Sequence, residues 1–217
     1  MKRIVKNPEP TAFANWKTNW SHTPGWDEFD QGTKQADGTS IKEKVKAALI
    51  EEQGGICCFC EKKFKRDHGH IDHLRAKSKP ENLGLVLAYN NLLYSCPENP
   101  KGKPQTCGHA QGEETPPITP LDADCELRFI YSVSGAILPR SRNDDEAIQT
   151  IALLNLNDEQ AVFYGKRAEA YKEIMEKQKT LPPEVFKHWI TNMLKRQPDG
   201  TFKEFWTTRK YAAGLYS

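Results

Sequence analysis

The chain of 217 residues has a formal net charge of +2 and contains six cysteines. Its length is sufficient to bury a hydrophobic core without disulfides, and its small net charge excludes a uniformly basic protein of the histone type. Neither a signal peptide nor an apolar run long enough to span a bilayer is present, which predicts a cytoplasmic protein with no membrane partner. In a reducing compartment the cysteines are expected to be metal ligands or buried thiols.

The predicted elements begin with an irregular, Trp-rich segment, residues 1–40. Trp16, Trp20 and Trp26 are expected to fold back onto the body of the protein, with few long helices between them. A capping box, Ser40-Ile41-Lys42-Glu43, then predicts a helix from Ile41 to about Gln53. The permissive backbone of Gly54-Gly55 is expected to end this helix.

Residues 41–142 are expected to form the core of an α+β fold. Six prolines between Pro97 and Pro120 predict an irregular excursion of the chain. Apolar residues then alternate with polar ones from Leu127 to Val133, and Ser134-Gly135 can turn the chain back. This pattern predicts a β-hairpin.

Residues 143–217 are predicted to be helical. Asn143 is expected to cap a helix that runs to Leu154, and Asn157 with Gln160 a longer helix towards Lys179. Pro182-Pro183 is expected to open a third helix. Acidic and basic residues are equally numerous in this part, which indicates support of the core or docking of a partner.

Cysteines at ligand spacing are the strongest feature of the sequence. A CxxC knuckle places two thiolates on one turn, and a second pair from later in the chain completes a tetrahedral site for a structural zinc ion. The predicted ligands are Cys57, Cys60, Cys96 and Cys107. His109 lies within reach of the same corner but is expected to have another use. Two cysteines lack a partner at ligand spacing and are expected to be buried thiols: Cys58 and Cys125.

Asp72-His73 carries the predicted catalysis. Hydrolysis of a phosphodiester needs a base to deprotonate water and a cation to neutralise charge in the transition state. His73, whose ordinary pKa is near neutrality, is suited to be the base, and Asp72 is suited to bind Mg²⁺ or Mn²⁺. Neighbouring side chains of a strand point to opposite faces, so both can approach one phosphate only near the end of a strand.

These cysteines, Asp72-His73 and Asn91 together resemble the HNH motif of the His-Me finger nucleases, a ββα-metal fold. The resemblance implies a metal-dependent endonuclease, that is, a phosphodiester hydrolase, in which His73 is the general base and Asn91 orients it. It also implies that Asp72 and His109 hold the catalytic metal. Asn90 competes with Asn91, but the Asn-Leu-Leu-x-x-Cys register favours Asn91.

The sequence departs from the HNH pattern after the last cysteine. Gly108 stands where the family usually has Asn or His, and Gln111 stands where Lys is common. The identity of the second ligand of the catalytic metal is therefore open between His109 and His70.

A closer resemblance covers most of the chain. The similar segments are residues 70–78, Pro120-Leu121-Asp122, the hairpin, and Leu154-Asn155-Leu156-Asn157 before an Arg-bearing helix. They resemble the Septu-type HNH subunit, PtuB, of antiphage defence systems, some of which accompany retrons. This resemblance implies a PtuA-like partner, an ATPase of the ABC/SMC type. It further implies regulation by a retron reverse transcriptase with its RNA–DNA product.

Basic residues flank the proposed site on both sides. Convergence on one site predicts phosphate contacts, above all from Arg75 and Lys77. The others are Lys62, Lys63, Lys65, Arg66, Lys79, Lys101 and Lys103. No base-reading array is evident, so both DNA and RNA, including tRNA, stay open as substrates. The alternative function is a zinc-stabilised adaptor that binds nucleic acid or protein without catalysis.

Overall fold

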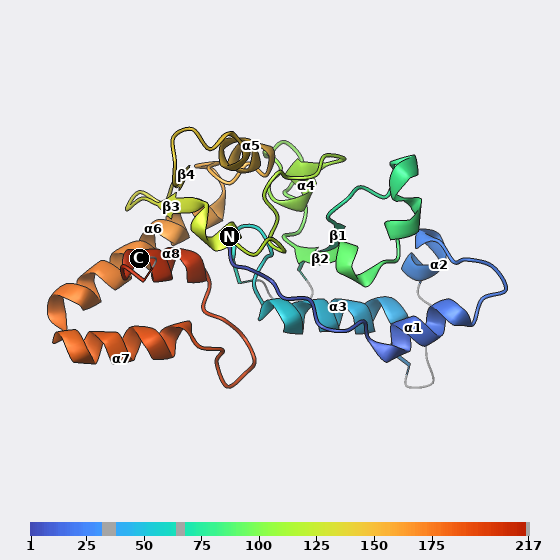
Figure 1. Ribbon diagram of the computed structural model, residues 1–217, viewed down its shortest axis with the longest axis horizontal. Helices are drawn as coiled ribbons and strands as arrows, with labels where there is room; N and C mark the ends of the chain where they lie inside the picture. The colour runs from blue at the N-terminus through green and yellow to red at the C-terminus, as the bar shows by residue number, and fades with distance from the viewer. Residues whose placement is uncertain (32–37, 64–67, 216–217) are drawn as a thin grey trace.

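The computed structural model describes residues 1–31, 38–63 and 68–215, which form an α+β fold with two small antiparallel sheets (Figure 1). Helices α1 and α2 lie at one end of the molecule and α6 to α8 at the other, while α3 runs through the middle next to β1 and β2, and β3 and β4 lie over α6 and α8. The elements, in chain order, are α1 (Thr11–Thr18), α2 (Trp26–Asp30), α3 (Ile41–Gln53), β1 (His70–His73), the 3₁₀ helices η1 (Pro80–Leu85) and η2 (Tyr89–Asn91), β2 (Leu92–Ser95), α4 (Gly108–Gln111), the 3₁₀ helix η3 (Cys125–Leu127), β3 (Phe129–Tyr131), β4 (Ile137–Pro139), α5 (Asp145–Leu153), α6 (Val162–Thr180), α7 (Pro183–Leu194) and α8 (Trp206–Ala212). None of the described helices combines the length and the apolar character needed to cross a bilayer.

Helix α3 begins and ends where the sequence predicts. The Ser40 hydroxyl accepts a hydrogen bond from the Glu43 amide over 3.1 Å, which satisfies one free donor of the first turn. Gly54 ends the helix at a φ of 65°, a left-handed conformation that glycine adopts without steric cost. Both terminal signals are therefore confirmed.

The N-terminal tryptophans pack onto α3, as expected. Helices α1 and α2 contact α3 and place Trp16 in a core with Phe13 and Phe29. Trp20 and Trp26 lie half-buried at the edge of this core. The segment is not wholly irregular, because α1 has eight residues and α2 five, but it contains no long helix among its described residues.

The first sheet joins β1 to β2 in antiparallel register, with His70 opposite Ser95 and His73 opposite Leu92. The side chain of Gln53, at the end of α3, closes the other edge of β2. Its amide donates to the Tyr94 carbonyl over 2.8 Å and accepts from the Tyr94 amide over 2.7 Å. Helix α4, a single turn, follows later in the chain, so the order strand, strand, helix is present with a very short helix.

The predicted hairpin is the second sheet, β3 and β4. The turn closes with a 2.9 Å hydrogen bond from the Ser132 amide to the Ala136 carbonyl, and Gly135 has a φ of 97°. The alternating pattern predicts a longer strand than the one observed, because Leu127 lies in η3. Val133 lies beyond β3 and is exposed.

The C-terminal helices are confirmed, with corrections to two caps. Helix α5 is capped by Asp144, one residue after the predicted Asn143, and α7 begins at Pro183 as expected. The predicted cap of α6 by Asn157 and Gln160 is wrong, because α6 begins at Val162 after an uncapped Ala161. Asn157 instead pairs with β4. Its side chain accepts from the Ile137 amide and donates to the Ile137 carbonyl, each over 2.8 Å.

Arg167 of α6 is almost wholly buried and holds two turns of chain together. Its guanidinium donates to the carbonyls of Gly135 and Leu156 over 2.5 and 2.6 Å. The Leu154-Asn155-Leu156-Asn157 segment and the arginine after it therefore connect the helices to the hairpin.

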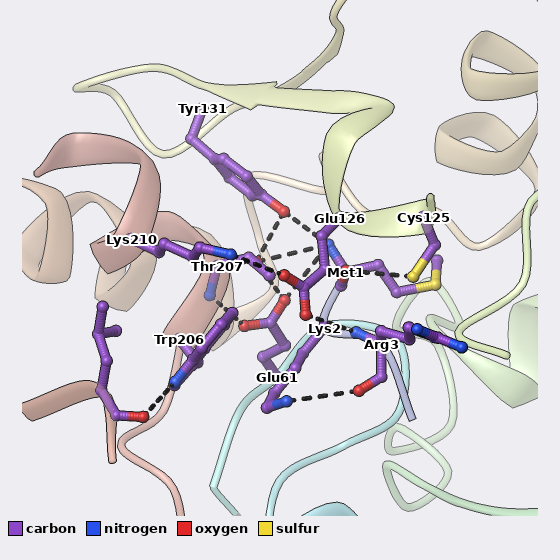
Figure 2. A network of polar contacts seen from close by, with 11 residues as sticks. Met1, Lys2, Arg3, Glu61, Cys125, Glu126, Tyr131, Trp206, Thr207 and Lys210 are labelled. Carbon is purple, nitrogen blue, oxygen red and sulfur yellow. Dashed lines mark hydrogen bonds and ion pairs between the residues drawn. The ribbon is translucent and has the colours of Figure 1, made fainter. Parts of the chain in front are cut away.

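A buried polar network links the cysteine knuckle to the far end of the chain (Figure 2). Glu61, next to Cys60, accepts hydrogen bonds from the Thr207 hydroxyl and, over 2.8 Å, from the Thr207 amide of α8. It also lies 3.3 Å from the amino group of Met1, which donates to the Tyr131 hydroxyl over 2.6 Å. One core cluster accordingly contains side chains from residues 1–40, 41–142 and 143–217. The three-part division itself stays a prediction.

Candidate functional site

Four cysteine thiols meet in the interior beside β2. The Sγ atoms of Cys57, Cys60, Cys96 and Cys107 all lie within 4.8 Å of one another, and each residue is buried. Four Zn–S bonds of about 2.3 Å in a tetrahedron place the sulfurs about 3.8 Å apart. The thiols therefore fit a zinc ion with four sulfur ligands, and no fourth ligand from His109 is needed.

Backbone and side-chain contacts fix the thiols. Cys57 lies 3.8 Å from the Ser95 hydroxyl, and the Cys107 amide donates to the Leu154 carbonyl over 2.9 Å. Burial alone would raise the pKa of the Cys57 thiol, but hydrogen bonds from the surrounding thiols, led by Cys107, hold that pKa well below its ordinary value. A thiol that loses its proton readily is a good metal ligand.

The two remaining cysteines lie outside this cluster. Cys58 is buried, and burial raises its pKa well above the ordinary value. Burial likewise raises the pKa of Cys125 to about 12, and its thiol faces the Met1 carbonyl at 3.7 Å. Both are neutral thiols in a hydrophobic core.

The side chains on the less buried face of β1, His70 and Asp72, form a second polar cluster near the cysteines. His70 Nε2 lies 3.7 Å from Asp72 Oδ1, and the rings of His70 and His109 are 4.1 Å apart between centroids. The other carboxylate oxygen, Asp72 Oδ2, is buried and has no hydrogen-bond partner among the described residues. A buried carboxylate oxygen without a partner is costly unless a cation or a ligand satisfies it.

His70 has the orientation of a metal ligand. Its Nδ1–H donates to the Cys96 carbonyl over 2.7 Å, which leaves Nε2 to face Asp72. Burial alone would lower the pKa of His70, but Asp72, the Cys96 carbonyl and Cys57 together raise that pKa above its ordinary value. Burial lowers the pKa of His109, and the nearby His70 lowers it further. The structure thus places His70 beside Asp72, and His109 beside His70.

The absence of a side chain at Gly108 leaves space for the Asp72 carboxylate. A Cβ atom at this position would lie 2.2 Å from Asp72 Oδ2. The Gly108 amide donates to the Ser95 hydroxyl over 3.1 Å, which ties this turn to the cysteine cluster. The departure from the HNH pattern at position 108 therefore has a steric reason.

His73, the last residue of β1, points to the other face of the strand. Its Nε2–H donates to the Val86 carbonyl over 3.0 Å, and its ring packs edge-on against Trp26 with centroids 4.5 Å apart. Burial lowers the pKa of His73 below its ordinary value. His73 thus stands at the strand end, as expected, but the structure does not bring its ring and the Asp72 carboxylate to one face.

Asn91 holds the chain that follows His73. Its side-chain oxygen accepts from the Arg75 amide over 2.9 Å, and its nitrogen donates to the carbonyls of Arg75 and Leu85 over 3.1 Å each. Asn91 is buried, whereas Asn90 is exposed. These contacts reach the backbone beyond His73 and not its imidazole.

Sequence reasoning missed two residues that hold His73. Trp26 packs on the imidazole from α2, and the distance in sequence hides this contact. Gln111 is buried and donates to the carbonyls of His73 and Leu74 over 3.2 and 3.0 Å. Gln111 stands where the HNH pattern often has Lys, which marks the position as unusual. The spacing of a motif does not show, however, which backbone carbonyls the side chain contacts.

The predicted phosphate-binding residues differ in their surroundings. Arg75 and Lys77 are exposed near the end of β1, and Lys77 Nζ lies 4.4 Å from the centre of the Trp26 ring. Lys63 instead pairs with Asp199, and Lys79 with Glu114. Two of the predicted residues fall outside the described residues: Lys65 and Arg66.

The chain is similar to a curated bacterial protein, and no family model matches it. The relative is "Retron Vc95 putative HNH endonuclease" from Vibrio cholerae serotype O1 biovar El Tor, with 32% identity over 126 residues. The matched part is 56% of this chain and 61% of the relative, so the chain spans about three fifths of that protein. The similarity supports the HNH endonuclease class for this chain.

Proposed function

We propose that this protein is a metal-dependent endonuclease of the HNH type, with a ββα-metal core, that hydrolyses phosphodiester bonds in nucleic acid. The observation that carries the proposal is the arrangement at the end of β1. There the Asp72 carboxylate has one oxygen 3.7 Å from His70 Nε2 and a second, buried oxygen without a hydrogen-bond partner among the described residues, and His73 lies on the opposite face of the strand. A zinc-stabilised scaffold would need the cysteines but not this set of groups.

His73 acts as the general base in this proposal. Because its Nε2–H donates to the Val86 carbonyl, Nδ1 carries the lone pair that accepts a proton from the attacking water. Gln111 positions His73 through the carbonyls of His73 and Leu74, and Asn91 through the backbone of Arg75 further along the chain. Trp26 restricts the rotation of the imidazole.

Asp72 and the histidines beside it fit a hard divalent cation, Mg²⁺ or Mn²⁺. Asp72 would supply the carboxylate ligand and His70, whose Nε2 lies 3.7 Å from that carboxylate, an imidazole nitrogen. His109, whose ring packs beside that of His70, is the other candidate for the histidine ligand. When bound, the cation supplies positive charge against the charge that develops on the phosphoryl oxygens. The cysteine cluster, which would hold zinc, supports this corner through the hydrogen bond from His70 to Cys96.

The biological setting that we propose is an antiphage defence complex of the Septu or retron type. The name of the Vibrio cholerae relative and the resemblance to PtuB support this setting. The partner would be a PtuA-like ATPase, with regulation by a retron reverse transcriptase and its RNA–DNA product. Purification of the protein from its native host should recover the ATPase, and a nuclease that purifies alone and fully active would contradict this assignment.

Cleavage by substituted proteins tests the catalytic proposal. His73→Ala should lower cleavage of DNA or RNA in Mg²⁺ or Mn²⁺ by about a thousandfold, because a positioned general base contributes on the order of 10² to 10⁴ in rate. Asp72→Ala should abolish cleavage as well, with zinc content and melting temperature unchanged in both variants.

His188→Ala is the matched control, because His188 is an exposed histidine on α7. It should cleave like the wild type. Full activity of His73→Ala would rule out the proposed base. Nucleic-acid binding without cleavage by the wild type, alone or with its partner, would instead favour the adaptor.

A further inference from the structure

An open groove of about 1060 Å³ runs from the candidate base into the N-terminal part of the molecule. It lies between the α1–α2 segment and the chain that connects β1 to β2, two segments at the same end of the molecule (Figure 1). The residues that matter for its chemistry are Lys17, Trp20, Trp26, Lys77, Leu83 and Val86. Two of its lining residues, Val86 and Trp26, contact His73, so the groove lies beside the candidate base.

Two tryptophan rings in the groove are held from behind. Trp20 packs edge-on against Trp16, with centroids 5.7 Å apart, and Trp26 packs against Phe29 at 5.0 Å. Both tryptophans are only half-buried. A ring that is already fixed loses little conformational freedom when a planar ligand stacks on it. Leu83, which is 69% exposed, adds apolar surface to the same groove.

Two lysines lie beside these rings, and the exposed carboxylate of Asp27 belongs to the same lining. Lys77 Nζ lies 4.4 Å from the centre of the Trp26 ring, and Lys17 lines the groove while it pairs with Glu9. The carboxylate of Glu28, which also lines the groove, is engaged by the Gly25 amide at 2.9 Å and by His22 at 3.4 Å. Aromatic rings interspersed with lysines are the combination that single-stranded nucleic acid requires, because its bases stack and its phosphates need cations.

We infer that this groove binds unpaired nucleotides next to the scissile phosphate, with a base stacked on the Trp20 and Trp26 platform. The preferred substrate is then a single strand or the loop of a folded nucleic acid, because a base within a duplex has no face to offer. The inference rests on the proposed function, since it takes the phosphate at His73 as the point where the strand enters. A strand already held there extends directly into the groove.

Binding to a cleavage-deficient protein tests the inference. The zinc-loaded full chain with Asp72→Ala, without added Mg²⁺, is titrated into labelled 12-nucleotide single strands, hairpins with an unpaired loop, and blunt duplexes, each as DNA and RNA. The single strands and loops should bind at least tenfold more tightly than the duplexes by fluorescence anisotropy. Trp20→Ala in this background should weaken single-strand binding about tenfold, and Trp20→Phe should retain most of it.

Trp189→Ala serves as the matched control, because Trp189 is a half-buried tryptophan on α7, at the other end of the molecule. It should bind like the parent. Equal affinity for duplexes, or single-strand binding that Trp20→Ala leaves unchanged, would overturn the inference. The inference would also be overturned if the protein bound no oligonucleotide and a co-purifying protein were lost when Trp20 is replaced.

Failure of the proposed function gives a different result. If the wild type binds single strands through Trp20 but cleaves no polymer in Mg²⁺ or Mn²⁺, the stacking platform is supported and the nuclease is not. If the wild type cleaves duplexes as well as single strands and His73→Ala does not, the nuclease is supported and the platform is not.

Discussion

The cysteine cluster and the Asp72 cluster lie side by side, yet their polar groups are satisfied to different degrees. The four thiols form a complete set of ligands in a closed, buried position. Asp72 retains an oxygen without a hydrogen-bond partner among the described residues, and its side chain and that of His70 are 13% and 30% exposed. Structural metal sites are saturated by the protein, whereas catalytic sites keep a position for substrate or water. The cysteine cluster, whose ligand set is complete, therefore fits a structural role, and the Asp72 cluster, which keeps an oxygen for a ligand, fits a catalytic one.

The hydrogen bond from His70 to Cys96 links the two clusters. Ser95 adds a second link, because its hydroxyl lies beside Cys57 and accepts from the Gly108 amide. The cysteine cluster fixes where the Asp72 cluster stands, but it should not respond to changes there. The predictions below test this one-way dependence.

Loss of a cysteine ligand should have the largest effect. Cys57→Ser should release zinc and lower the melting temperature by about 10 °C or more, because a structural metal contributes directly to folding. Cleavage should be lost with the fold. Zinc content by atomic absorption and melting followed by circular dichroism measure both effects. Cys125→Ser, in the same core but outside the cluster, should keep its zinc, and an equally stable Cys57→Ser protein would contradict the structural role.

Crowding at Gly108 should affect the Asp72 cluster alone. Gly108→Ala places a Cβ atom against the Asp72 carboxylate and should move it by the ångström or so that costs about a hundredfold in cleavage rate. Zinc content should not change. Gly165→Ala is the control, since a Cβ atom there meets nothing within 4 Å. Normal cleavage by Gly108→Ala would show that Asp72 has no fixed role.

The pH dependence of cleavage should show the smallest effect. Burial lowers the pKa of His73, so the base stays neutral at pH values where an ordinary histidine is half protonated. Activity should fall as the pH drops through this lowered pKa, which places the acid limb below about pH 6.5. Trp26→Ala admits water to the imidazole and should shift the limb upward. Rates of cleavage between pH 5 and 8 measure it, and a limb above pH 7 would contradict a buried neutral base.

Local signals in the sequence predicted local structure well. The hydroxyl of Ser40 and the free backbone of Gly54 act within one turn, so the bounds of α3 follow from neighbouring residues. The spacing of the cysteines similarly indicated their convergence. The expected cap at Asn157 is wrong because an asparagine can either cap a helix or pair through its side chain with a strand, and the sequence does not distinguish these two uses.

Contacts across the fold could not be predicted in this way. Position 26 lies 47 residues before His73 in the numbering, and only the packing of α2 brings Trp26 to the imidazole. The choice between His70 and His109 was open because the two rings come together from different elements, and only His70 lies within 3.7 Å of Asp72. Such contacts depend on the relative placement of elements, on which hydrophobic periodicity carries no information.

The Gln53 side chain has a consequence for assembly. Its amide group offers β2 the same donor and acceptor as a peptide bond, so it occupies the position of a third strand at Tyr94. An unprotected edge of a sheet invites another chain to add a strand, which is a common route to aggregation. The Gln53 side chain and the Cys58 amide, which donates to the same Tyr94 carbonyl over 3.2 Å, block that route here beside the cysteine cluster. A partner that recognises this end of the molecule must therefore bind its side chains and not extend its sheet through Tyr94.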